Sequence, residues 1–255
     1  MSLNLSVHQE DWIPTVPFRI SNAVWHSCPA VVVELQDGDL VGRGEAEGVY
    51  YFGETPEVMI GQVEAVADQI EAGATRADLL ELMPPGGARH GLDAALWDLE
   101  AKRSGRRAWE LAGLPLKEIV TVYSIGLEDE PEGQADKAAA AADQPVLKVK
   151  LGADRPVERI EAIRAVRPDA TIAIDANQGW SFDQLKEVAP RLQRLGVSMI
   201  EQPLPRGADE ALEGYQAPLP LCADESCVRG GELEPAAPRY QLSTIKLDTC
   251  GGLTH

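Results

Sequence analysis

The sequence is poor in cysteine and in basic residues. Its four cysteines, Cys28, Cys222, Cys227 and Cys250, are scattered over 255 residues without C-x-x-C spacing, which argues against a zinc site or a disulfide framework. Lysine and arginine together number 23 against 41 acidic residues, so the formal net charge is −18. This charge repels phosphate groups and anionic lipid, so neither nucleic acid nor a membrane surface is an expected partner.

Long apolar runs are missing as well. No run approaches the roughly 20 residues that a membrane-spanning helix needs. The opening MSLNLSVHQEDWIP has neither the basic nor the apolar region of a signal peptide. Together with the pattern of unpaired cysteines, these absences predict a protein of the cytoplasm.

What is present is an ordinary globular composition, with 44% apolar residues. In residues 30–48 a β-branched run, the turn-forming DGD and an alternating run predict a hairpin. Residues 56–73 and 88–105 carry apolar side chains at helical spacing, and each stretch ends in glycine, which predicts two helices. We therefore predict an α+β domain over residues 1–118.

The pattern changes after residue 118. Apolar strand candidates recur, and helix-like stretches such as 156–166 and 181–195 lie between them. Ser181 and Gln184 have the spacing of a capping box, which supports a helix start there. Alternation of buried strands and helices predicts a parallel α/β sheet. The six strand candidates are IVTVYSIG, VLKVKLG, TIAIDAN, VSMIEQP, LPLCADES and STIKLDT.

Polar residues at the ends of these strands recur at intervals of about one βα unit, as in a (β/α)8-type barrel. A doubly wound sheet gives similar intervals but does not so readily place a polar residue at the same end of every strand. We predict a modified barrel over residues 119–255, for which the preceding α+β domain is a cap. Since a closed barrel needs eight strands, we expect about two further βα units after His255. The intervals are 25 positions from Lys150 to Asp175, 26 to Glu201, 23 to Asp224 and 22 to Lys246.

Three of these strand ends carry carboxylates, namely Asp175, Glu201 and Asp224. If the ends meet at one barrel mouth, their mutual repulsion requires a cation. Ligation by carboxylate oxygens suits Mg2+, and also Mn2+. The alternative is that each residue caps a following helix. Asn177, two positions after Asp175, is a further candidate ligand.

Lysines flank the three carboxylates. Lys148 and Lys150 share one face of their strand, and Lys246 and Asp248 share one face of a later strand. A buried lysine beside a second lysine and a divalent cation has its ammonium form disfavoured, so we expect its pKa to fall and the amine to act as a base. A base on one face and an acid on the other would invert a carbon next to a carboxyl group through an enediolate.

The motifs LKVKLG, DANQGW, EQPLP, CADESC and IKLD…GGLT together resemble the muconate-lactonizing branch of the enolase superfamily, and most closely its dipeptide epimerases. The resemblance implies a capping domain that closes over a small-molecule substrate, either a dipeptide or an N-acylamino acid, and a homo-oligomer. It implies that Asp175, Glu201 and Asp224 bind Mg2+. It also implies that Lys150 and Lys246 are the acid and base on opposite faces. Lys148 would assist the enolate oxygen and lower the pKa of Lys150.

Substrate contacts are expected from Ser124, Asp248, Arg19 and Asn22. Members of the family that act on Ala–Glu dipeptides often carry arginine where this chain has Asn22. The family frequently has lysine after IKLD, where this chain has Thr249. Its Asp-x-Asp that binds the dipeptide ammonium group lies on the last barrel strand, beyond His255.

Three functional interpretations therefore remain open. The first is Mg2+-dependent epimerisation of dipeptides by 1,1-proton transfer. The second uses the same site as an N-succinylamino acid racemase or an o-succinylbenzoate synthase. The third is a barrel that kept the scaffold without catalysis.

Overall fold

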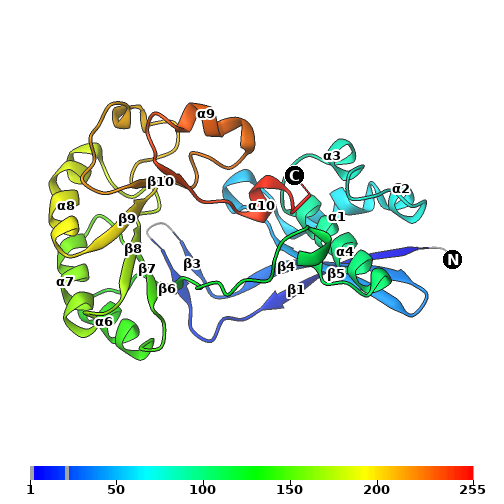
Figure 1. Cartoon of the computed structure of the whole chain (residues 1–255), viewed down its shortest axis with the longest axis horizontal. Helices are drawn as coiled ribbons and strands as arrows, with labels where there is room; N and C mark the ends of the chain where they lie inside the picture. Colours follow the sequence, from blue (N-terminus) through cyan, green and yellow to red (C-terminus); the bar gives the residue numbers. More distant parts are fainter. Residues whose placement is uncertain (1–2, 21–22, 255) are drawn as a thin grey trace. The chain divides into compact units, whose positions relative to one another are not determined.

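The computed structural model describes residues 3–20 and 23–254, and the chain forms two compact units (Figure 1). The first unit comprises the residues up to Pro14, Ser27–Glu118 and the residues from Ile245 on. The second comprises Thr15–His26 and Ile119–Thr244. The predicted domain boundary between residues 118 and 119 stays a prediction.

The first unit is built on an antiparallel sheet with the strand order β1-β4-β5. The predicted hairpin is confirmed, because β4 and β5 pair through a short turn at Gly38. The strands are β1 (Asn4–Trp12), β4 (Cys28–Asp37) and β5 (Leu40–Glu47), and the helices are α1 (Pro56–Glu64), α2 (Ala67–Glu71), α3 (Leu79–Leu82), α4 (Gly87–Ser104), α5 (Ala108–Leu111) and α10 (Leu247–Cys250), with a 3-10 turn η1 (Tyr50–Phe52).

Helix α4 packs directly on β5 because β5 presents glycines to it. A Cβ atom at Gly44 would lie 2.0 Å from the carbonyl oxygen of Gly91, and one at Gly42 would lie 2.4 Å from that of Ala95. Leu92 and Leu99 of α4 are fully buried in the core of this unit. The predicted helix over 88–105 is thus confirmed, and the glycines of β5 explain how close it lies to the sheet.

The second unit contains a parallel sheet of six strands in the order β11-β10-β9-β8-β7-β6. Figure 1 shows helices α6, α7 and α8 lined along one side of this sheet, where their apolar faces join the core. The sheet strands are β6 (Tyr123–Ile125), β7 (Val146–Lys150), β8 (Thr171–Asp175), β9 (Val197–Glu201), β10 (Leu221–Ala223) and β11 (Leu242–Ser243). The remaining elements are the ribbon β2 (Phe18–Arg19) and β3 (Val24–Trp25), α6 (Pro131–Ala140), α7 (Pro156–Val166), α8 (Phe182–Arg194), α9 (Leu233–Ala236) and the 3-10 turns η2 (Glu210–Leu212) and η3 (Gly230–Glu232).

The predicted fold class is confirmed, with an α+β cap followed by barrel-type βα units. Helix α8 starts where expected, because the Ser181 hydroxyl accepts a hydrogen bond of 3.1 Å from Gln184 N. Among the described residues, no helix combines the length and the apolar character that crossing a membrane requires.

Two local predictions were wrong. The helix expected over 56–73 is divided at Val66, where the backbone makes a tighter bond from Val66 N to Val63 O. The strand expected over IKLD is absent among the described residues, since β11 ends at Ser243 and Lys246 immediately precedes α10. Strand β11 has one described strand neighbour, β10, with two paired residues, so the ladder gives little support to a longer strand.

Candidate metal centre

The register of the parallel sheet brings charged residues from neighbouring strands into one row. Lys150 pairs with Asp175, and Asp175 pairs with Glu201. Glu201 pairs with Cys222, so Asp224, two positions further on, follows on the same face. The strand-end carboxylates therefore meet because the strands are adjacent and in register.

The three carboxylates form a compact buried group, which we call the acidic triad: Asp175, Glu201 and Asp224. One oxygen from each lies within 4.8 Å of the others. Their exposed fractions are 0%, 1% and 2%. Such burial is costly for carboxylates unless positive charge or hydrogen-bond donors compensate it.

Two lysines supply part of that compensation. Lys150 Nζ lies 2.7 Å from Asp175 Oδ2. Lys148 Nζ lies 2.7 Å from Glu201 Oε1 and 3.1 Å from Asp175 Oδ2, so it bridges two members of the triad. The two lysines thus contact two members of the triad, Asp175 and Glu201.

These ion pairs shift the protonation of the triad. Burial tends to raise the pKa of Asp175, but the charges of Lys150 and Lys148 hold it below its usual value. Burial and the charge of Asp175 raise the pKa of Glu201. For Lys148, burial works toward a lower pKa, but the two carboxylates outweigh burial and raise it. The expected fall in lysine pKa concerns a lysine beside a bound cation, and it stays a prediction.

The chain turns sharply after Asp175. Asn177 and Gln178 have φ angles of 44° and 65°, in the left-handed region. This turn lets Asn177 N donate a 2.9 Å hydrogen bond to Asp175 Oδ1, which fixes the carboxylate. The buried Asn177 Oδ1 has no hydrogen-bond partner among the described residues.

A divalent cation fits this site. The donor set consists of carboxylate oxygens, which Mg2+ and Mn2+ prefer, and the unpaired Asn177 Oδ1 is a further oxygen donor close in sequence to Asp175. Three carboxylate oxygens within 4.8 Å of one another repel, and a cation between them would offset that repulsion. The residues that would hold the metal are Asp175, Glu201 and Asp224.

Gln202, which no sequence motif marks as functional, organises the loop that carries Asp224. Gln202 Oε1 accepts hydrogen bonds of 3.0 Å from the backbone N–H groups of Asp224 and Ser226. Its Nε2 donates to Leu204 O at 2.8 Å, to Ser226 Oγ at 2.9 Å and to Tyr240 Oη at 3.1 Å. Gln202 is fully buried and has a φ angle of 35°.

A buried aspartate, Asp209, also belongs to this network. Asp209, with 1% exposure, accepts 2.7 Å hydrogen bonds from the hydroxyls of Ser226 and Tyr240, and Arg239 Nη1 lies 2.9 Å away. The sequence signal for Gln202 is weak, since only its place after the strand-end Glu201 marks it. Nothing in the sequence links Asp209 to Tyr240, because that contact depends on the folded loop.

The remaining candidate residues occupy different places. Ser124 lies on β6, is exposed and pairs in register with Lys148, next to the lysine row. Arg19 on β2 donates a 2.6 Å hydrogen bond to Asp129 Oδ1. Asn22 lies outside the described residues.

Lys246 and Asp248 belong to the first unit, whereas the acidic triad belongs to the second. Asp248 Oδ1 lies 4.0 Å from His90 Nε2. Burial, and then the charges of Glu45 and Glu54, raise the pKa of Asp248 to about 6. Their roles in substrate contact and catalysis stay predictions.

Comparisons with known proteins cover nearly the whole chain. The family model "Mandelate racemase / muconate lactonizing enzyme, N-terminal domain" matches residues 2–113, and the model "Enolase C-terminal domain-like" matches residues 132–255. The L-Ala-D/L-Glu epimerase of Escherichia coli (strain K12) is 39% identical over 252 residues, which are 98% of this chain and 78% of that protein. An N-acetyl-D-glutamate racemase of a Pseudoalteromonas species is 35% identical over 88% of this chain and 71% of its own length.

Solved structures agree with these matches. An enolase family member from Agrobacterium tumefaciens with homology to dipeptide epimerases, with bound sodium and L-Ala-L-Glu, superimposes with a TM-score of 0.95 at 40% identity, covering 99% of this chain and 77% of that one. A dipeptide epimerase from Enterococcus faecalis V583, complexed with Mg and L-Leu-L-Tyr, gives a TM-score of 0.90 at 25% identity, covering 99% and 76%.

Proposed function

The chain belongs to the mandelate racemase/muconate lactonizing enzyme family of the enolase superfamily, and we propose that it is a Mg2+-dependent epimerase that inverts an α-carbon of a dipeptide. The observation that carries the proposal is the buried acidic triad, whose oxygens lie within 4.8 Å of one another and which two lysines contact. The epimerase named in Escherichia coli and the dipeptide-bound structure from Agrobacterium tumefaciens support the substrate class.

The reaction that we propose is a 1,1-proton transfer. When bound by the acidic triad, Mg2+ would stabilise the negative charge that develops on the substrate after the α-proton leaves. Lys150, with a side chain 12% exposed, would take or return the proton on one face of the α-carbon. By family resemblance, Lys246 would do so on the other face. Because each lysine serves one face, each epimer depends on a different base.

The contacts of Lys148 suit a supporting role. It bridges Glu201 and Asp175, and these carboxylates raise its pKa, so it is held as an ammonium group. A permanent positive charge there would favour negative charge on a neighbouring substrate oxygen. Lys148 is therefore a better electrostatic stabiliser than a base.

A second substrate class is the alternative to dipeptides. The racemase from Pseudoalteromonas favours an N-acylamino acid as the second candidate substrate class. Within the described residues, Arg19 is already paired with Asp129 at 2.6 Å. An acidic substrate side chain would therefore share the Arg19 guanidinium with Asp129 or displace it.

One experiment separates the substrate classes. The purified protein with Mg2+ is incubated in D2O with a set of L,L-dipeptides and, in parallel, with N-acetyl and N-succinyl amino acids, and deuterium at each α-carbon is measured by mass spectrometry. We expect uptake with dipeptides together with appearance of the inverted epimer. Exchange with N-acylamino acids alone would favour the second candidate, and no exchange in either set would overturn the proposed chemistry.

We further propose that the protein acts in the cytoplasm. We also propose that it forms a homo-oligomer, as members of the family commonly do. Light scattering after size-exclusion chromatography tests the oligomeric state. A monomer at micromolar concentration would contradict it.

A further inference from the structure

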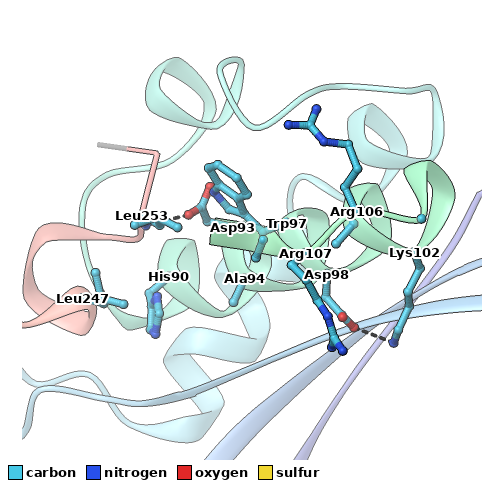
Figure 2. Close-up of a pocket in the computed structure, with 13 residues that line it drawn as sticks. His90, Asp93, Ala94, Trp97, Asp98, Lys102, Arg106, Arg107, Leu247 and Leu253 are labelled. Atoms are coloured by element: carbon cyan, nitrogen blue, oxygen red, sulfur yellow. Dashed lines mark hydrogen bonds and ion pairs between the residues drawn. The ribbon is translucent and has the colours of Figure 1, made fainter. Parts of the chain in front are cut away.

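Side chains of helix α4 bind residues 250–254, a segment that begins at the last residue of α10. Figure 2 shows Asp93 and Trp97 of α4 directed toward this segment near Leu253. Asp93 Oδ2 accepts hydrogen bonds from Leu253 N at 2.7 Å and from Thr254 N at 3.2 Å. The Thr254 hydroxyl donates to Asp93 Oδ1 and accepts from Trp97 Nε1 at 3.0 Å.

A second side chain of α4 holds the start of the same segment. Arg89 Nε donates to Gly251 O at 2.9 Å, and its Nη2 donates to Cys250 O at 2.7 Å. Arg89 and Asp93 are 3% and 1% exposed. They are four residues apart and so lie on one face of α4, one turn from each other. Hydrogen bonds to charged, buried groups are the stronger kind, which makes this a rigid attachment.

Glycines allow the segment to come this close. Gly251 and Gly252 have φ angles of 82° and 114°, which L side chains rarely adopt. A Cβ atom at Gly251 would lie 2.5 Å from Arg89 Nε, and one at Gly252 would lie 2.5 Å from Asp93 Oδ2. The attachment to α4 thus requires glycine at both positions, because a Cβ atom would clash with α4 side chains and because the backbone has positive φ angles.

The attached segment is joined to Lys246 by a single helical turn. Lys246 is the N-cap residue of α10, and its carbonyl oxygen accepts hydrogen bonds from Cys250 N at 3.1 Å and from Thr249 Oγ1 at 2.9 Å. Since α10 has four residues, fixing Cys250 and Gly251 also fixes the backbone of Lys246.

We propose that Arg89 and Asp93 are positioning residues for Lys246, so that helix α4 of the cap sets the geometry of one of the two bases. The inference rests on the proposed function, in which Lys246 serves one face of the α-carbon and Lys150 the other. Neither Arg89 nor Asp93 touches substrate in this account. Loosening them should therefore impair proton transfer on one face and spare the other.

The test is stereospecific deuterium exchange by the full chain with saturating Mg2+. Each epimer of a substrate dipeptide is supplied separately in D2O, and initial exchange at the α-carbon is measured for Arg89→Lys and Asp93→Asn. Lys150→Ala and Lys246→Ala identify which epimer each base handles. A displacement of about 1 Å can cost on the order of 100-fold in rate. We expect the α4 variants to lose roughly 10- to 100-fold on the Lys246 epimer and less than about threefold on the Lys150 epimer.

Asp98→Asn is the matched control. Asp98 also lies on α4 and accepts hydrogen bonds, but from Arg43 N and Lys102 Nζ and not from the 250–254 segment. We expect it to leave the ratio of the two exchange rates unchanged. Equal losses on both epimers, or no loss on either, in the Arg89 and Asp93 variants would overturn the positioning role.

Two further measurements keep the outcome interpretable. Mg2+ binding by titration calorimetry reports on the acidic triad, and we expect it to be unchanged by Asp93→Asn. If Asp93→Asn does not fold, Thr254→Val removes the hydroxyl bonded to Asp93 and Trp97 and should give a smaller imbalance in the same direction. Failure of the proposed function is distinct, because the wild-type protein or both lysine variants would then show no epimer-dependent exchange.

Discussion

Replacing Gln202 with leucine should weaken Mg2+ binding through the loop that carries Asp224. Leucine keeps most of the volume of the side chain but removes every polar atom. The N–H groups of Asp224 and Ser226 and the carbonyl of Leu204 then lose a partner within a fully buried site. Each buried polar group left unpaired costs about 1–3 kcal/mol, and partial relaxation of the loop should limit the total to about 2–5 kcal/mol of unfolding free energy.

The effect on the metal follows from the same bonds. With its N–H released, Asp224 is free to move away from Asp175 and Glu201. Loss of a group that orients a metal ligand typically lowers affinity about 10- to 100-fold. We expect a decrease of that size for Mg2+ in Gln202→Leu, measured by titration calorimetry alongside urea unfolding.

Gln193→Leu is the control for this comparison. Gln193 is exposed and donates one hydrogen bond of 2.7 Å to Pro218 O. Its replacement should change stability by no more than about 0.5 kcal/mol and leave Mg2+ affinity unaltered. If Gln202→Leu binds Mg2+ as tightly as the wild type and unfolds at the same urea concentration, the assigned role of Gln202 is wrong.

Three other predictions concern the metal, pH and packing. Saturating Mg2+ should stabilise the protein by about 2.7 kcal/mol at a hundredfold excess over Kd, and Asp175→Asn should abolish this shift in thermal unfolding; equal shifts in both proteins would refute the site. The pKa of Asp248 is raised to about 6 in the folded state from 3.8, so its contribution to stability is present below pH 4 and is lost as the pH rises through 6. Asp248→Asn should therefore flatten the fall in Tm between pH 4 and 7, and an unchanged pH profile would contradict the assignment. Gly44→Ala should destabilise by at least about 2 kcal/mol because its Cβ meets backbone at 2.0 Å. Gly61→Ala in α1, whose Cβ meets no described atom within 4 Å, should stabilise by about 0.5–1 kcal/mol in the same denaturation assay.

Much of the metal centre could be predicted from sequence because strand periodicity carries the information. A strand-end residue and the residue two positions before it face the same side, so Lys148 and Lys150 could be placed together with Asp175 once the strands were known to be parallel. Adjacent parallel strands also bring their carboxyl ends, and so the strand-end carboxylates, to one edge of the sheet. The structure adds the ion pairs, at 2.7 Å for Lys150 and at 2.7 and 3.1 Å for Lys148.

What sequence could not give depends on contacts between distant segments. The stretch IKLD has the apolar alternation of a strand, yet Lys246 precedes a short helix, and α4 holds the residues that follow this helix. The buried role of Gln202 depends on Ser226 and Tyr240, which lie 24 and 38 positions further along the chain. Local patterns do not record such partners.

The pairing of Asp175 with Glu201 depends on an irregularity in the sheet that no pattern in the sequence marks. Ile172 pairs with Val197, but Ala173 pairs with Met199, so Ser198 is an additional residue in β9. Regular pairing from Ile172 would set Asp175 opposite Ile200, and Glu201 would then point to the other face of the sheet. The extra residue is accommodated by a bulge, in which the Ser198 hydroxyl donates a 2.9 Å hydrogen bond to Ile172 O. The acidic triad therefore exists because this bulge shifts β9 by one residue and returns Glu201 to the face that carries Asp175.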